Sequence, residues 1–244
     1  MKQLLLSLSA ALLLSSPALA ANQNIVLGTA NTITFRGPVD GSSITRAQLK
    51  LVELVKARGS KKYPLYLVLD SPGGSIIAGL AFEDFAKTIP NLHTITIFSA
   101  SMAAGFVEAL PGRRYILDTG ILMFHRAKGG FEGQFEEGEV ESQLKLWKEI
   151  VLKMENDSAS RIGIPLSEYK AKVINEWWLF GASAVVQKAA DEVVSITCTQ
   201  DLIDEREIIT QRMFIFVSTS EYSGCPLFRA PLPSKSKPEE EEEE

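Results

Sequence analysis

The stretch FSASMAAG, residues 98–105, joins a strand-like run to a helix-compatible run. Residues 94–98 are apolar or β-branched, and residues 103–110 are typical of a helix. A serine at such a junction, Ser101, exposes its hydroxyl beside a helix N-terminus, where free N–H groups and the helix dipole favour developing negative charge. This placement suits a nucleophile. The alternative interpretation is that the small residues only let the helix pack closely.

Alternating strand and helix patterns surround this junction. Strand patterns at 31–37, 65–69 and 94–98 are separated by helix patterns that follow Gly41-Ser42-Ser43 and cover 76–88. The run 65–69 is nearly all apolar, which is typical of a parallel strand buried between helices. Further strands are expected at 115–117 and 121–124, joined by Asp118-Thr119-Gly120, and a last strand from about Asp191. This order predicts an α/β fold with a largely parallel sheet.

One long helix is predicted for residues 135–162. Apolar side chains recur on it alternately four and three residues apart, at Val140, Leu144, Trp147, Val151 and Met154. A stripe of this kind packs either on the chain's own core or on a second copy of the chain. Both interpretations are open at this point.

The two ends of the chain differ in composition from the middle. Residues 1–20 contain Lys2, an apolar run over 4–14 and Ala18-Leu19-Ala20, which together predict a signal peptide cleaved after Ala20; an uncleaved anchor is the alternative. We therefore expect an exported protein, periplasmic or secreted, with one domain over 21–230. Residues 231–244 are rich in proline and glutamate, which predicts a disordered acidic tail.

The charge balance of the chain does not favour a nucleic-acid-binding function. The chain has 25 Lys and Arg against 30 Asp and Glu, and glutamates 239–244 account for the acidic excess. The folded body is thus close to neutral, and no basic patch favours nucleic acid. No metal or cofactor site is predicted.

In an exported protein Cys198 and Cys225 form either a disulfide or two buried thiols.

Ser101 needs a base, and the chain has two histidines, His93 and His125. His93 lies in a predicted loop and is expected at the surface, whereas His125 ends a predicted buried strand. Because the ends of parallel strands meet at one edge of a sheet, we expect Ser101, His125 and the Gly73-Gly74 turn to share a cleft. Glycine N–H groups beside a nucleophile suit an oxyanion hole. Together these features predict acyl transfer.

Three motifs, in this order, resemble the proteolytic subunit of the Clp protease. They are DSPGGS at 70–75, ASMAAG at 100–105, and Phe124-His125 followed by GGFEGQ at 129–134. The likeness covers roughly residues 33–197. It implies the Clp protease–crotonase fold, a spiral of βαβ units with a long protruding helix. It also implies that Ser101 is the nucleophile and His125 the general base, with the N–H groups of Gly74 and Met102 as the oxyanion hole.

The chain departs from that family at the third member of the triad. An alignment without a gap from Gly163 to Asp191 puts Glu176 where the family has an aspartate. A glutamate there would orient the imidazole and stabilise its charged form. The alternative is that Glu176 is an ordinary surface carboxylate and that Asn175, or no residue, completes the triad. Asp191 looks like the start of the last strand rather than a catalytic group.

Cellular context is a second departure. The family works with a cytosolic ATP-driven unfoldase, and an exported chain is not expected to meet one, so its substrates should be peptides or unfolded proteins. By the same likeness the helix 135–162 would join copies into a homo-oligomer, and the loop 129–134 would offer a strand edge to substrate. The resulting prediction is a serine endopeptidase. The alternatives are a catalytically inactive assembly or binding module, which the departure at Glu176 favours, and a crotonase-type acyl-CoA enzyme.

Overall fold

A parallel sheet forms the centre of the computed structural model, which describes residues 23–129, 136–213 and 216–233. The strand order is β1-β7-β5-β4-β3-β2, and β6 pairs with β5 beside this path. All pairs in this sheet are parallel except β5 with β6. The prediction of an α/β fold with a largely parallel sheet is confirmed. The strands are β1 (Gln23–Leu27), β2 (Thr32–Arg36), β3 (Leu65–Ser71), β4 (Leu92–Ala100), β5 (Arg114–Phe124), β6 (Trp177–Phe180) and β7 (Glu192–Cys198).

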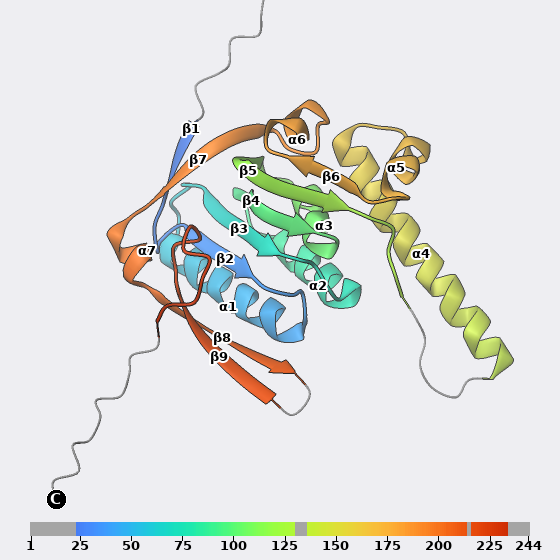
Figure 1. Cartoon of the computed structure of the whole chain (residues 1–244), viewed down its shortest axis with the longest axis horizontal. Coiled ribbons are helices and arrows are strands. Elements are labelled where there is room, and N and C mark those ends of the chain that lie inside the picture. Colours follow the sequence, from blue (N-terminus) through green and yellow to red (C-terminus); the bar gives the residue numbers. More distant parts are fainter. Residues whose placement is uncertain (1–22, 130–135, 214–215, 234–244) are drawn as a thin grey trace, which may run out of the picture.

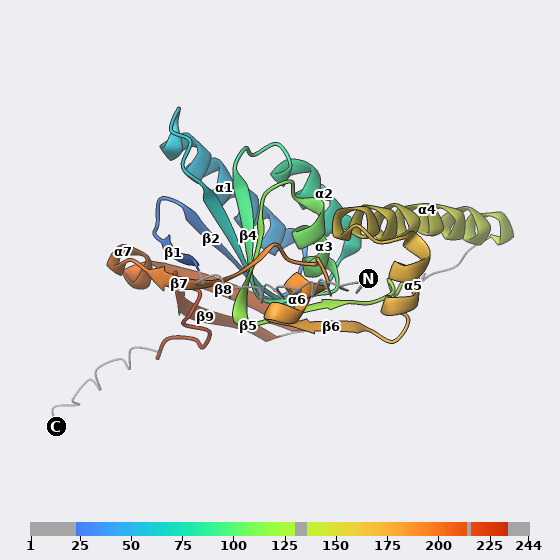
Figure 2. The ribbon, with the colours of Figure 1, turned by 90° about the horizontal axis from the view of Figure 1, so that it is seen from above.

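Three helices, α1 (Gly41–Arg58), α2 (Ile76–Ala86) and α3 (Met102–Ala109), cover one face of this sheet (Figures 1 and 2). The start of α1 follows from its cap. The Asp40 carboxylate accepts a hydrogen bond from the Ser43 N–H at 2.8 Å, and the Ser43 hydroxyl accepts one from the Asp40 N–H at 3.0 Å. Between sheet and helices lies the larger hydrophobic core, whose centre is the aromatic trio Phe35, Phe82 and Phe106.

The opposite face of the sheet is covered by segments that the sequence patterns had not predicted. They are the short helix α7 (Gln200–Asp204) and the hairpin of β8 (Arg206–Met213) and β9 (Phe216–Ser223). The strand β1 belongs to the sheet itself and contributes Ile25 and Leu27 to the core on this face. A second, smaller core packs here. Its buried members include Leu27, Val68, Ile95, Val194 and Cys225.

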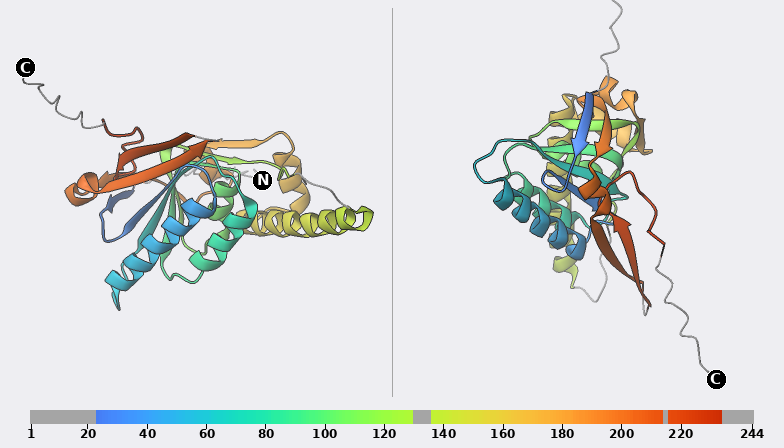
Figure 3. Two further views of the ribbon diagram at one scale, coloured as in Figure 1. Left: turned by 90° about the horizontal axis from the view of Figure 1, so that it is seen from below. Right: turned by 90° about the vertical axis from the view of Figure 1, so that its left-hand side faces the viewer.

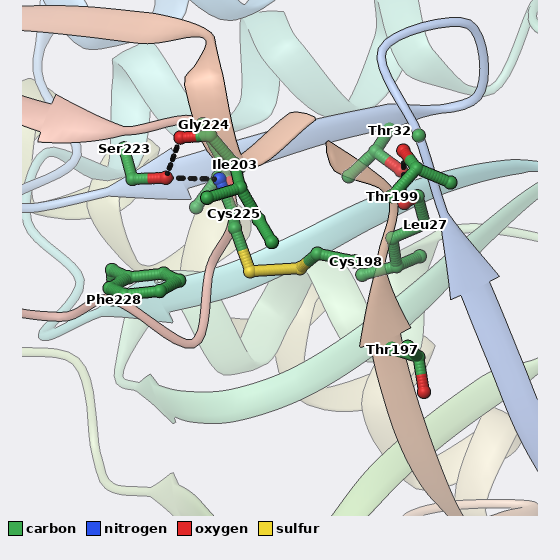
Figure 4. The surroundings of a disulfide bond; sticks show 12 residues. Leu27, Thr32, Thr197, Cys198, Thr199, Ile203, Ser223, Gly224, Cys225 and Phe228 are labelled. Carbon is green, nitrogen blue, oxygen red and sulfur yellow. Dashed lines mark hydrogen bonds between the residues drawn. A yellow bond between two sulfur atoms is a disulfide. The ribbon is translucent and has the colours of Figure 1, made fainter. Parts of the chain in front are cut away.

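A disulfide ties this side together. Cys198, at the end of β7, is bonded to Cys225, just after β9, with 5.9 Å between the two Cα atoms (Figure 4). Beside it the Ser223 hydroxyl donates to the Ile203 carbonyl at 2.7 Å. Of the two hypotheses for the cysteine pair, the structure contains the disulfide. The crosslink joins the segment after the hairpin to the main sheet.

The strand β5 corrects one prediction. Two strands joined by Asp118-Thr119-Gly120 were expected, but residues 114–124 form one continuous strand. The register explains the difference, because Thr96 of β4 lies opposite Ile116 while Phe98 lies opposite Ile121. The extra residues of β5 therefore form an irregularity in the strand rather than a turn. A Cβ at Gly120 would lie 2.6 Å from the Thr96 carbonyl oxygen, so only glycine fits there.

The long helix α4 (Glu137–Ile162) lies within the predicted range 135–162 and extends away from the body (Figures 1 and 3). Its two halves differ. In the half near the body Met154 packs on the core, and Ala159 and Ile162 are buried. In the outer half Val140 and Leu144 are 41% and 40% exposed. The apolar stripe thus packs on the chain's own core at one end and stays exposed at the other.

Two shorter helices, α5 (Leu166–Val173) and α6 (Ala182–Val186), connect α4 to β6 and β7. The predicted signal peptide, most of the loop 129–134 and the tail from residue 234 lie outside the described residues. Among the residues that the structure does describe, no helix has the length and apolar character needed to cross a membrane.

Candidate active site

Ser101 occupies the junction between β4 and α3. It is the residue that precedes the first helical residue, Met102, and its backbone has φ 57° and ψ −123°. A positive φ at a residue with a Cβ costs about 1–3 kcal/mol and persists only where the surroundings impose it. Here the Ser101 N–H donates to the Met123 carbonyl at 2.9 Å, which fixes the turn against β5. The side chain does not cap the helix, so the hydroxyl is available for another contact.

That contact is with His125. The Nε2 atom of His125 lies 2.7 Å from Ser101 Oγ, within hydrogen-bond distance. The sheet produces this pairing, because Ala100 of β4 lies opposite Met123 of β5 and both strands end at the same edge. The other ring nitrogen, Nδ1, is buried and has no hydrogen-bond partner within the described chain.

The second histidine, His93, lies near the opposite end of β4. Its Nδ1 accepts a hydrogen bond from the Arg113 N–H at 2.8 Å, and its Nε2 lies 2.9 Å from Asn91 Oδ1. Burial, together with the charge of Arg113, lowers the pKa of His93. Both nitrogens are therefore occupied by structural contacts, far along the strand from Ser101.

The Gly73-Gly74 turn after β3 lies against the Ser101 turn. Both glycines have positive φ, at 86° and 151°. A Cβ at Gly73 would lie 2.7 Å from the Ser101 Cβ and 2.8 Å from the Met102 nitrogen, so the two backbones approach more closely than any side chain allows. The N–H groups of Gly74 and Met102 donate to no acceptor among the described residues. The two turns that meet at Ser101 thus each carry an N–H without an acceptor among the described residues.

Glu176 lies on the turn that leads into β6. The antiparallel register pairs Phe124 with Trp177, so His125 and Glu176 are the residues that follow at that end of the ladder. The side chain points elsewhere, however. Glu176 is exposed, has φ 66°, and its Oε2 accepts a hydrogen bond from the Trp178 indole N–H at 3.0 Å. No hydrogen bond joins Glu176 to His125 in the described structure, and its place in a triad stays a prediction.

A small cavity of about 50 Å³ opens beside Ser101 and His125. Its walls come from α2, α3, β5, α4 and α5, and the side chains are mostly apolar: Ile76, Met102, Phe124, Val151 and Met154, with Glu155, Ser158 and Tyr169 as polar members. A larger cavity of about 270 Å³ lies between α1, β2 and β8. That cavity contains neither Ser101 nor His125, so chemistry rather than size marks the site.

With this geometry in place, comparison with known families gives a clear result. The family model described as Clp protease matches residues 20–197. The chain belongs to the Clp protease family. Members of this family are peptidases that typically form oligomers and act on peptides. The match ends before β8, so the disulfide-linked hairpin lies outside the segment that the Clp protease model covers.

Asp191 of this Clp protease chain takes part in a network of ion pairs. Asp191, which was expected to start a strand, immediately precedes β7 and forms an ion pair with Arg114 at 2.6 Å. Arg114 also pairs with the buried Glu108 at 2.6 Å.

The pocket residues Glu155, Ser158 and Tyr169 were not predicted. For Glu155 and Ser158 the sequence did contain a signal. Both extend the apolar stripe of the long helix through Val151 and Met154 at helical spacing. The described residues contain no cluster of three or more metal-ligating side chains.

Proposed function

We propose that this chain is a serine endopeptidase that cleaves peptides or unfolded proteins. The observation that carries the proposal is the 2.7 Å contact between Ser101 Oγ and His125 Nε2, made at the N-terminus of α3 and beside a pocket. A hydroxyl with a neighbouring imidazole is the arrangement that activates a serine for attack on a carbonyl. Membership of the Clp protease family supports a peptidase in general.

In the proposed mechanism His125 Nε2 takes the proton of Ser101 as Oγ attacks the scissile carbonyl carbon. Negative charge then develops on the carbonyl oxygen, and the free N–H groups of Gly74 and Met102 stabilise it, with the dipole of α3 adding to the effect. The protonated His125 next donates its proton to the departing amine. A water molecule, activated by the same imidazole, hydrolyses the acyl-enzyme and restores the serine.

Glu176 is proposed as the residue that orients His125. An imidazolium with an unpaired, buried Nδ1–H is costly, so catalysis needs an acceptor there. Glu176 immediately precedes β6, the strand paired with the end of β5, and its present partner is a single exposed indole. The proposed role requires Glu176 to exchange that contact for the imidazole of His125.

A second candidate function, a catalytically inactive module, is supported by the contacts that His125 and Glu176 do not make. The unpaired Nδ1 of His125 and the exposed Glu176 are also what a catalytically inactive assembly or binding module would contain. The two candidates make opposite predictions for a mechanism-based probe. A fluorophosphonate should label the wild-type chain at Ser101 and leave the Ser101→Ala variant unlabelled. An inactive module would give no labelling of either chain and no peptide hydrolysis.

Export is the proposed location. Support comes from the basic and apolar pattern of residues 1–20, from a family match that starts at residue 20, and from the disulfide of Cys198 and Cys225, a bond typical of oxidising compartments. An exported peptidase would work without an ATP-driven unfoldase. The intact mass of the protein from its native host should correspond to a chain that begins at Ala21. A chain that retains residues 1–20 would contradict this proposal.

The outer half of α4 is proposed to join copies of the chain. Its apolar side chains Val140 and Leu144 are exposed and regularly spaced, on a helix that extends away from the body (Figure 3). Packing against a second such helix would bury them. A homo-oligomer formed this way would limit access of folded proteins to Ser101.

A further inference from the structure

The helix α4 forms one wall of the pocket beside Ser101. Four of its residues come from α4, and their spacing of three and four residues puts Val151, Met154, Glu155 and Ser158 on one face of the helix. Three of these side chains are apolar or small. The fourth, Glu155, is the acidic side chain among the described residues that line this pocket, and only 13% of it is exposed.

A carboxylate in such a position is costly unless a cation pairs with it. The cation that the chain supplies is Lys170 of α5, whose Nζ lies 3.4 Å from Glu155 Oε2. The Lys170 side chain is 47% exposed, so its ammonium has solvent as an alternative partner. Solvent compensates the half-exposed Lys170 when it leaves the pair, whereas Glu155 needs a cation to replace it. A substrate cation that takes the place of Lys170 keeps the carboxylate of Glu155 paired.

The other lining residues are suited to contact the stem of a long basic side chain. Ile76, Phe124, Val151 and Met154 provide apolar walls for methylene groups, and Glu155 provides an acceptor for the charged end. We infer that this pocket selects lysine or arginine as the residue on the acyl side of the scissile bond, and that Glu155 determines this preference. The inference rests on the proposed peptidase function and names the substrate class of the same site.

Four peptidyl coumarin amides test it, identical except for Arg, Lys, Leu or Glu before the scissile bond. The full wild-type chain should cleave the Arg and Lys reporters with kcat/KM at least about tenfold above Leu, and Glu least of all. Glu155→Gln should lower kcat/KM for Arg and Lys by roughly 10- to 100-fold, the value of one charge-assisted hydrogen bond. Its kcat/KM for the Leu reporter should fall less than that for Arg and Lys, so the Arg-to-Leu ratio should drop by about tenfold or more, and a thermal unfolding midpoint close to that of the wild type shows that the variant is folded.

Two further variants separate the pocket carboxylate from general charge effects. Glu149→Gln removes an exposed carboxylate from the same helix and should leave the Arg-to-Leu ratio unchanged. Lys170→Met removes the chain's own partner of Glu155 and should raise the ratio, because the substrate cation then has no competitor.

The outcomes distinguish this inference from the proposed function. Cleavage of the Leu reporter with no preference for Arg or Lys, and with the same ratio in Glu155→Gln, would overturn the basic preference and leave the peptidase intact. No cleavage of any reporter, together with no fluorophosphonate labelling of Ser101, would overturn both. Labelling rates with lysine and leucine peptidyl phosphonates give a second readout that does not depend on turnover, and equal rates for the two would contradict the inference.

Discussion

The candidate site has an inner side and an outer side that differ in enclosure. The inner side consists of the Ser101 and Gly73 turns, and the residues after Ser101, from Met102 to Ala104, are almost completely buried. The outer side is the Glu176 turn, and we group with it the first turns of α4, which do not line the pocket; the side chains of both are mostly exposed. Ser101 and Glu176 both have a positive φ, 57° and 66°, so a positive φ does not distinguish the two sides.

Enclosure decides what each side chain contacts. The Ser101 hydroxyl lies where a packed turn and a neighbouring strand leave His125 as its partner, whereas Glu176 has the Trp178 indole and solvent as alternatives. The contact between Ser101 and His125 thus forms within one chain. The roles proposed for the outer side would need a different side-chain contact of Glu176 or a second copy of α4.

The largest effect is expected on the inner side. Ser101→Ala and His125→Ala should each lower kcat/KM for a peptide reporter by at least about 10³-fold, and the double variant should lose little more, because nucleophile and base act as a unit. Thermal unfolding midpoints close to that of the wild type would show that the fold is retained. Substantial hydrolysis by Ser101→Ala would mean that a different group performs the attack.

On the outer side Glu176→Gln should have a smaller effect, a loss of roughly 10- to 100-fold in kcat/KM, because both the orientation and the charge stabilisation of His125 suffer. Trp178→Phe is the matched control. It removes the indole N–H that binds Glu176 and leaves the carboxylate in place, so its activity should equal or exceed that of the wild type. If Glu176→Gln is fully active, another residue or none orients His125.

A moderate effect is expected from the exposed half of α4. Val140→Glu combined with Leu144→Lys should split the assembly into smaller folded species, measured by analytical ultracentrifugation, and lower activity several-fold. Leu49→Glu changes a more exposed apolar side chain on α1, 60% exposed, and should leave the assembly intact. A wild-type chain that sediments as a fully active monomer would contradict the role given to this helix.

The sequence predicted the inner side better than the outer one, for a physical reason. Parallel strands such as β4 and β5 end at a common edge, so the periodicity around Ser101 and His125 was enough to predict that they meet. Glu176 depends on a left-handed turn and on the rotamer of an exposed side chain, which no periodicity reports. The division of α4 also escaped prediction, because Val140 and Met154 share one stripe in the sequence but have different neighbours in space.

Some features of the fold escaped prediction for other reasons. The continuity of β5 through Asp118-Thr119-Gly120 depends on its pairing with β4, since those three residues by themselves are typical of a turn. The hairpin of β8 and β9 lies outside both the Clp protease match and the predicted strand–helix repeat. Its attachment through Cys198 and Cys225 was one of two open alternatives until the structure placed the cysteines together.

The smallest effect on activity is expected from a buried carboxyl that packs behind the inner side, Glu83 of α2. Its side chain is buried beside α3, where Oε1 lies 3.4 Å from the position of a Cβ on Gly105, and its one ion pair, with Lys87, is long at 3.8 Å. Burial raises the pKa of Glu83 from 4.5 to about 7, although Lys87 and Lys153 lower it in part. The native state therefore binds this proton more tightly than the unfolded state does.

The sign of the pH dependence follows from this difference. Between about pH 4.5 and 7 the folded chain carries the proton and the unfolded chain has lost it, so the free energy of unfolding falls as the pH rises through this window and is constant above it. Glu83→Gln cannot ionise. The variant should thus be more stable than the wild type at pH 8, by at most on the order of 3 kcal/mol, and the difference should vanish below pH 4.5. Urea unfolding from pH 4 to 8 measures it, with the exposed Glu149→Gln as control and peptide hydrolysis unchanged. A constant difference between Glu83→Gln and the wild type across that range would show that Glu83 is ionised in the folded chain, and that the inner side is less enclosed than its packing indicates.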